Sequence, residues 1–304
     1  MFDWHRTWRA AGAALLLGLA LPGQAQTANR AGTWAFSPAR DTFSSESLLD
    51  LRYLNEAVAG ESGFVRANAQ GDLILGNGQP LRLWAVNTTV ADHTNAPARP
   101  LWPLGPPDLA RHARFLAKRG VNMVRLHKQL SPDLQATPNA AITDINLSER
   151  DAIWRTVAAM RKEGIYTTLS PYWASATKLS PTWALAGGAK QSAEGLLFFD
   201  ETLQQAYKVW LRKLLTEKNP YTGISLAQDT SVAIIIELQN EDSLLFWTMD
   251  RIQGAQRLAL ERRYGSFLQK KYGSLGQAQQ AWRGAGEASD APQDARMALL
   301  ATKP

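Results

Sequence analysis

Four apolar, strand-like runs alternate with segments of helical periodicity, and this alternation limits the possible folds more than any other feature. The runs, with the helical segments that follow them, cover residues 81–86, 108–119, 121–127, 148–163, 165–170, 201–218, 232–239 and 249–272. Such alternation implies a parallel sheet with right-handed crossovers. No glycine-rich phosphate-binding loop follows the first strand, which argues against a nucleotide-binding doubly wound sheet. A TIM-type (β/α) barrel is therefore the predicted fold.

Local signals set the predicted boundaries of these elements. The pair Asn77-Gly78 lies between two apolar runs and predicts an N-terminal β-hairpin whose second strand enters the sheet. Asp108 is the predicted N-cap of a helix that ends at Gly120. The sequence Ser148-Glu-Arg-Asp151 has the spacing of a capping box, and Gly164 is the predicted end of the helix that it opens.

The last of the four strands carries the most promising chemistry. Its branched apolar run from Val232 is typical of a strand that is buried on both faces. It leads into the polar residues Glu237, Gln239, Asn240 and Glu241. In folds with parallel strands, sites lie at the carboxyl ends of the strands, so Glu241 is predicted to transfer a proton and Asn240 to bind a substrate beside it. The alternative is a strand that ends in solvated polar groups.

Composition excludes several classes of function. The chain has no cysteine, which excludes disulfides, a cysteine nucleophile and thiolate metal sites. His93 and His112 lack ligand-like spacing, so neither a metal nor a cofactor is predicted. The net charge of +6 is scattered, whereas a nucleic-acid-binding protein would gather it in a stripe. Eleven tryptophans favour a ligand with flat apolar faces, such as a sugar.

The start of the chain has the three parts of a secretory leader. Arg6 and Arg9 precede the apolar run 10–21, and small residues permit cleavage after Ala25. The apolar run is shorter than the about 20 residues that a membrane span needs. A secreted or periplasmic protein, without stable membrane insertion after cleavage, is predicted. An uncleaved anchor is the alternative.

The predicted division of the chain follows from this leader and from the first strand signals. The parts are a signal peptide at 1–25, a lead-in segment at 26–62 and a partial (β/α) barrel domain at 63–304. The spacing of apolar residues predicts a helix over 48–59, at the end of the lead-in segment.

Taken together, these motifs resemble the cellulase-like glycoside hydrolases of clan A, near family 5. The resemblance rests on Leu83-Trp-Ala-Val-Asn87, Val121-Asn-Met-Val-Arg125, the aromatic end of the third strand, and Glu237-Leu-Gln-Asn-Glu241. The tract 264–282 also looks like the helix after the acid/base strand in related β-galactosidase-type enzymes. The resemblance covers residues 63 to 282.

The resemblance implies roles for residues at the strand ends. Glu241 would be the general acid/base, Asn240 would bind the sugar 2-hydroxyl, and Arg125 would support the nucleophile. The family usually has proline after this glutamate, but this chain has Asp242. A second carboxylate would raise the pKa of Glu241 if both were buried, and would not if Asp242 pointed to solvent.

Four further residues at strand ends are candidates for substrate binding. Asn87 ends the first strand. His127 ends the second, where it would line the sugar site, orient Glu241 or simply be a hydrogen-bonded histidine. Tyr172 and Trp173 follow the third strand, either as a stacking platform for pyranose rings or as packing beneath the loop 174–200.

The sequence also predicts a missing partner for Glu241. A retaining glycosidase needs two carboxyl groups, and the resemblance implies that the nucleophile lies on the seventh strand. Residues 242–304 are too few for three more strand–helix units, so the barrel is predicted to be truncated after about four units and to lack the nucleophile strand. The predicted function is an exported, retaining glycoside hydrolase acting on a β-linked poly- or oligosaccharide. The alternative is a non-catalytic carbohydrate-binding or cell-envelope protein with a degenerate barrel.

Overall fold

The computed structural model describes residues 49–87, 109–190, 192–236, 238–243 and 248–299. The chain divides into two units, Met1–Ser45 and Glu46–Pro304, and the described residues all belong to the second. The predicted leader at 1–25 lies outside the described residues, as does the predicted N-cap Asp108. No helix in the described part is long and apolar enough to cross a membrane.

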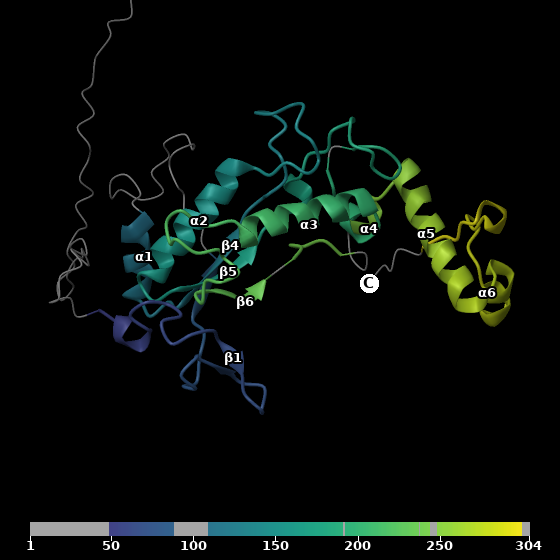
Figure 1. Cartoon of the computed structure of the whole chain (residues 1–304). Coiled ribbons are helices and arrows are strands. Elements are labelled where there is room, and N and C mark those ends of the chain that lie inside the picture. Colours follow the sequence, from purple (N-terminus) through teal and green to yellow (C-terminus); the bar gives the residue numbers. More distant parts are fainter. Residues whose placement is uncertain (1–48, 88–108, 191, 237, 244–247, 300–304) are drawn as a thin grey trace, which may run out of the picture. The chain divides into compact units, whose positions relative to one another are not determined.

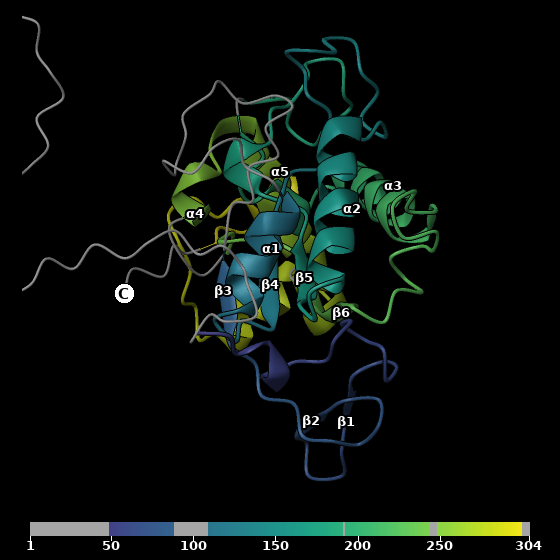
Figure 2. The same cartoon turned by 90° about the vertical axis from the view of Figure 1, so that its left-hand side faces the viewer.

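A four-stranded parallel sheet forms the centre of this unit (Figures 1 and 2). Its strands are β3 (Ala85–Asn87), β4 (Met123–His127), β5 (Tyr166–Ser170) and β6 (Val232–Ile236), which pair in chain order. The predicted alternation of parallel strands and helices is therefore confirmed. Within the described residues β3 and β6 are the two edges, so the sheet is open.

Helices α1 (Leu109–Ala117), α2 (Leu147–Arg161) and α3 (Glu201–Thr216) lie along one face of the sheet (Figures 1 and 2). The strands turn alternate side chains toward them. Val124 packs with residues of α1 and α2, and Leu126 belongs to the core that includes α3. Met123, Arg125 and His127 lie between these positions, so they face the other side of the sheet.

Caps and left-handed glycines set the helix ends. Gly120 and Gly164 have φ of +74° and +72°, as predicted for residues that end helices. The predicted capping box at Ser148 is wrong, because α2 begins earlier. Its N-cap is Asn146, whose side chain accepts a hydrogen bond from Glu149 N at 3.1 Å. Asp200 caps α3 in the same way.

The predicted hairpin is confirmed at its turn but not in its strands. β1 (Arg66–Ala67) pairs antiparallel with β2 (Leu73–Ile74), and the chain then reverses at Asn77-Gly78 so that Ile74 bridges Pro80. The strand predicted from Leu81 begins only at Ala85.

The helix predicted over 48–59 is wrong, since only the short 3-10 helix η1 (Arg52–Leu54) forms. Tertiary contacts outweigh the helical spacing here. Leu51 N donates to Lys118 O at 3.0 Å, and Ala59 N donates to Arg161 O at 2.9 Å. These bonds tie the segment to the ends of α1 and α2, and the second uses an amide hydrogen that a helix over 48–59 would need for itself.

The C-terminal part contains α4 (Thr248–Arg251), α5 (Gly254–Tyr272) and α6 (Leu275–Ala281). The single helix predicted over 249–272 is thus divided, with a break at 252–253. α5 and α6 enclose a separate small core of Leu268, Leu275, Ala278 and Met297. The remaining short elements are η2 (Ala174–Ala176), η3 (Leu196–Phe198) and η4 (Pro292–Asp294).

Candidate active site

A row of polar side chains crosses the sheet near the carboxyl ends of its strands. The strand register pairs Asn87 with Arg125, and Arg125 with Thr168. Two residues further along both strands, His127 pairs with Ser170. All five positions lie on the face opposite the helices, because side chains alternate along each strand. The sequence placed four of them, Asn87, Arg125, His127 and Ser170, at strand ends, but identified only the first three as candidate site residues.

Arg125 joins two of the strand ends. Its Nη2 donates to Ser170 Oγ at 3.2 Å and also to Asn240 Oδ1. A guanidinium has only donors, so the amide oxygen of Asn240 must be the atom that faces it. The backbone N of Asn240 donates to Tyr172 O at 3.2 Å, and its side chain is buried. The amide group therefore has a fixed orientation, with Nδ2 as its donor.

His127 and Trp173 pack against each other beside this network. Their ring centroids are 5.0 Å apart with a tilt of 54°. His127 Nδ1 lies 3.0 Å from Ser170 Oγ. Trp173 N donates to Gln129 Oε1 at 2.7 Å, and the Trp173 side chain is 41% exposed. An exposed indole that packs against His127 can stack on a flat apolar ligand surface.

The prediction of Tyr172 as part of this platform is wrong. Tyr172 is fully buried, and its ring packs 5.1 Å from that of Tyr207 on α3. Neighbouring residues of an extended segment point to opposite sides, so only Trp173 faces the polar row. Burial also raises the pKa of the Tyr172 hydroxyl well above its usual range, which is the signature of a core residue.

Glu241 follows the parallel strand β6, as predicted, and is exposed. Its φ is +47°, in the left-handed region that residues other than glycine seldom adopt. The adjacent Asn240 forms a parallel bridge with Trp173, so residue 240 lies beside the segment that follows the carboxyl end of β5. Asn87 is likewise exposed at the end of β3.

Neither of the two alternatives for Asp242 is found. Asp242 does not form a buried pair with Glu241, and it does not point to solvent. Its two carboxylate oxygens accept hydrogen bonds from Gly195 N at 3.1 and 3.0 Å, and one also accepts from Gln239 Nε2 at 2.5 Å. Burial raises the pKa of this carboxyl, while the hydrogen bonds offset part of the effect. Asp242 thus ties the segment that carries Asn240 and Glu241 to the loop before α3.

The raised pKa of Asp242 predicts a pH-dependent effect of Asp242→Asn on stability. As the pH rises above about 4, Asp242 loses its proton in the unfolded chain before it does so in the folded chain, so its ionisation favours unfolding. The asparagine in Asp242→Asn does not ionise and lacks this effect. The wild type should therefore lose stability relative to Asp242→Asn through this range, and the difference should then stay constant. Urea unfolding of both proteins from about pH 3.5 to 7 measures it. A difference that moves the other way would show a lowered pKa.

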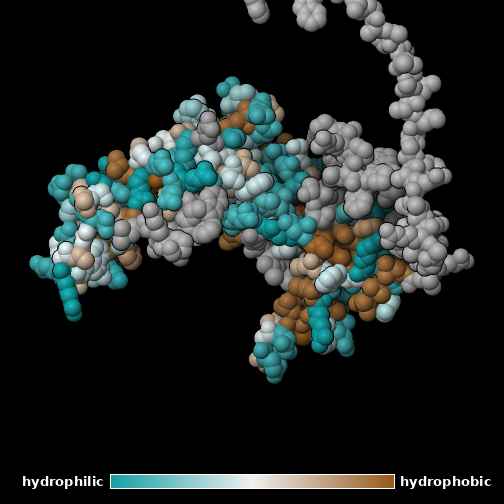
Figure 3. Space-filling model, turned by 180° about the vertical axis from the view of Figure 1, so that it is seen from behind, coloured by the Kyte–Doolittle hydropathy of each residue, from teal (hydrophilic) through white to brown (hydrophobic). Residues whose placement is uncertain are grey.

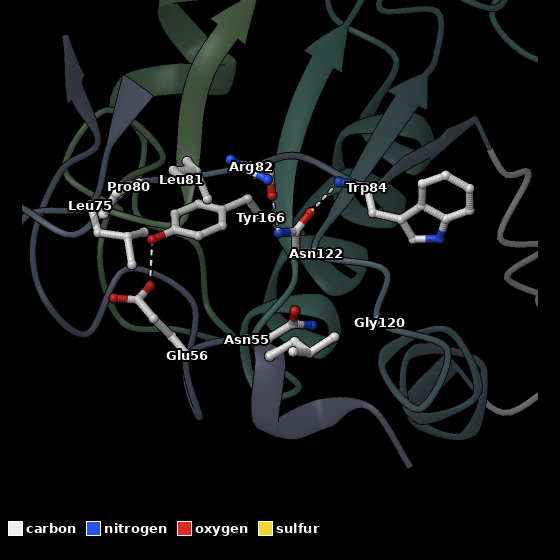
Figure 4. A pocket seen from close by; sticks show the side chains of 12 residues that line it. Asn55, Glu56, Leu75, Pro80, Leu81, Arg82, Trp84, Gly120, Asn122 and Tyr166 are labelled. Atoms are coloured by element: carbon white, nitrogen blue, oxygen red, sulfur yellow. Dashed lines mark hydrogen bonds between the residues drawn. The ribbon is translucent and has the colours of Figure 1, made fainter. Parts of the chain in front are cut away.

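A pocket of about 380 Å³ lies at the opposite end of the sheet, among the amino ends of the strands (Figure 4). It is lined by Glu56, Tyr166, Asn122 and Trp84 among others. Apolar side chains gather around it and the hairpin (Figure 3). Since the polar row is at the carboxyl ends, the pocket is separate from the candidate site.

The Glu56 carboxylate in this pocket has a structural function. It accepts hydrogen bonds from Tyr166 OH, from Ser62 Oγ and from Gly60 N, the last at 2.8 Å. Burial acts to raise the pKa of Glu56, but these hydrogen bonds outweigh it and lower the pKa. The group therefore anchors the segment before the hairpin to β5.

Sequence reasoning missed Ser170 and Gln129, which hold His127 and Trp173 in place. The available signal for Ser170 was its position as the last residue of a predicted strand, next to a polar strand end. Gln129 lies beyond β4 in an irregular segment, where no periodicity indicates the direction of a side chain.

No protein-family model matches the chain, and no curated protein matches it. Among the described residues there is no group of three or more His, Asp or Glu side chains placed to hold a metal ion.

Proposed function

We propose that this protein is an exported, retaining glycoside hydrolase that acts on β-linked poly- or oligosaccharides. The observation that carries the proposal is the joining of Arg125, Asn240 and Trp173 at the carboxyl ends of three parallel strands. This arrangement offers an amide donor for a sugar hydroxyl beside an exposed indole for a sugar ring. Glu241, the next residue after Asn240, supplies a carboxyl group at the same edge.

In the proposed reaction Glu241 serves as the acid and then as the base. Its carboxyl gives a proton to the glycosidic oxygen while a second carboxylate attacks the anomeric carbon and the C–O bond breaks. Its carboxylate then takes a proton from the water that releases the sugar. Asp242 is not the proposed nucleophile, because its oxygens are held by Gly195 and Gln239.

The backbone conformation of Glu241 supports a functional role for this residue. A left-handed conformation costs a residue other than glycine about 1–2 kcal/mol. Asn240 N and the Asp242 carboxylate are both hydrogen-bonded, so the chain is held on either side of the strained residue. Strain of this kind gathers at functional sites.

The four parallel strands are proposed as consecutive strands of a (β/α) barrel. Three features support this: their order in the sheet follows their order in the chain, helices cover one face, and polar side chains occupy the other face near the carboxyl ends. In barrels of this type the face away from the helices is the interior, and the carboxyl ends carry the site.

Hydrolysis and its stereochemistry test the proposal. The protein should release the phenol from aryl β-glycosides, and NMR should show that the first sugar product keeps the β configuration. Inversion would contradict the retaining mechanism. No release from any β-glycoside in a panel of hexosides and pentosides would contradict a glycosidase.

A non-catalytic carbohydrate-binding protein is the second candidate. The exposed Trp173 favours it, because sugar binding requires this side chain and the fixed Asn240 but no second carboxylate. Sugar affinity without any turnover would distinguish it from a glycosidase.

Trp173→Ala should weaken sugar binding under either function. Aromatic stacking contributes about 0.5–1.5 kcal/mol, so the affinity for a β-linked oligosaccharide should fall by about two- to tenfold. Calorimetric titration of the folded variant measures it. Trp84→Ala is the matched control, because Trp84 is 64% exposed but lies at the amino ends of the strands. Equal losses in both variants would place the sugar elsewhere.

A further inference from the structure

Ser170 stands between Arg125 and His127, at the end of β5. Its side chain is fully buried. Its Oγ lies 3.2 Å from Arg125 Nη2 and 3.0 Å from His127 Nδ1. Among the described residues these are the hydrogen-bond partners of the hydroxyl group.

The chemistry of these three groups fixes the direction of each hydrogen bond. Arginine has only donors, so Ser170 Oγ must accept from Nη2. The hydroxyl hydrogen then needs an acceptor, because a buried donor left without one destabilises the fold by about as much as a lost hydrogen bond. His127 Nδ1 meets this need only when it carries no proton.

We propose that Ser170 is a positioning residue that holds His127 as the tautomer with a proton on Nε2. The opposite tautomer would point the Nδ1 hydrogen at Oγ and leave the serine hydrogen without its acceptor. In this tautomer Nε2 carries the proton of the imidazole ring that packs against Trp173. The tautomer itself is independent of the function, but its use toward a sugar hydroxyl rests on the proposed glycosidase or sugar-binding function.

The tautomer can be read directly by NMR. The chain has four histidines, and the signals of His127 are those that disappear in His127→Gln. At about pH 8, above the ordinary histidine pKa of about 6.5, long-range ¹⁵N–¹H correlation spectra should show an unprotonated Nδ1 and a protonated Nε2. A proton on Nδ1 in the wild type would overturn the proposal.

Variants of Ser170 test the cause. In Ser170→Ala the shifts of both ring nitrogens should move away from the wild-type values toward those of the other tautomer, because a preference of about tenfold is lost. Ser170→Thr keeps the hydroxyl and should restore the wild-type pattern. Ser180→Ala, which removes another buried serine hydroxyl, bonded to Thr182, is the control and should leave the His127 signals unchanged. Unchanged His127 signals in Ser170→Ala would refute the assignment.

A kinetic measurement links the tautomer to the proposed function. If the protein hydrolyses aryl β-glycosides, Ser170→Ala should lower kcat/KM by about tenfold, with Ser170→Thr close to the wild type. A changed tautomer with unchanged kcat/KM would remove His127 from the site while leaving its positioning by Ser170 intact. Absence of hydrolysis in the wild type would refute the proposed enzyme without affecting the NMR result.

Discussion

Glu241→Gln is expected to lower kcat for hydrolysis of an alkyl β-glycoside by about 10²–10⁴-fold, the usual contribution of general acid–base catalysis. Glutamine has the same shape but no proton to donate and no carboxylate to accept one. Because Glu241 is exposed, the change should leave the midpoint of urea unfolding almost unaltered. Glu287→Gln, another exposed glutamate but outside the sheet, is the matched control and should keep full activity.

The leaving group gives this experiment a sharper form. A phenol of low pKa departs without help from an acid, so activated aryl glycosides should lose less in the first step of the Glu241→Gln reaction than alkyl glycosides do. Steady-state release of the phenol and its pre-steady-state burst separate the two steps. An equal loss for every leaving group would show that Glu241 acts by binding or by structure. Unchanged hydrolysis in Glu241→Gln would refute the assignment of Glu241 as the general acid/base.

The chain order and direction of the sheet could be predicted because they follow from patterns that are local in the sequence. The apolar run from Val232 forms β6, which ends at Ile236 and not at the predicted 239, and Gly120 and Gly164 follow helices as predicted. Parallel pairing then followed from the alternation of elements alone. The helix predicted over 48–59 does not form, because the segment is bonded to distant parts of the chain, Leu51 N to Lys118 O and Ala59 N to Arg161 O.

The candidate site also has residues whose place the sequence could predict and residues whose place it could not. Asn240, Arg125 and Trp173 could be placed together because they end neighbouring parallel strands. The buried direction of Tyr172 could not be foreseen, since it depends on which of two adjacent aromatic rings meets Tyr207 on α3. The same is true of Asp242, whose partner Gly195 belongs to a loop without periodicity. Side chains that are fixed by irregular segments therefore escape sequence patterns.

Gly164→Ala should have the largest effect on stability. Gly164 lies where the segment before the hairpin is anchored to the sheet. Gly164 has φ +72°, and a Cβ added there would lie 2.0 Å from Glu56 O and 3.2 Å from Asn55 Cβ. The left-handed conformation costs alanine about 1–2 kcal/mol, and overpacking adds about 1–3 kcal/mol. The free energy of unfolding should fall by about 2–5 kcal/mol, measured by urea denaturation.

The clash at Gly164 cannot be relieved by a small shift, because Glu56 is held in place by its own carboxylate. That group bonds to Tyr166 OH and Ser62 Oγ, so moving the backbone of Glu56 would break these contacts. Gly223→Ala separates the two costs, since Gly223 has φ +80° and nothing within 4 Å of an added Cβ. It should lose only the conformational part, about 1–2 kcal/mol. Equal losses in the two variants would mean that the segment around Glu56 yields freely, and that its hydrogen bonds to the sheet do not anchor it.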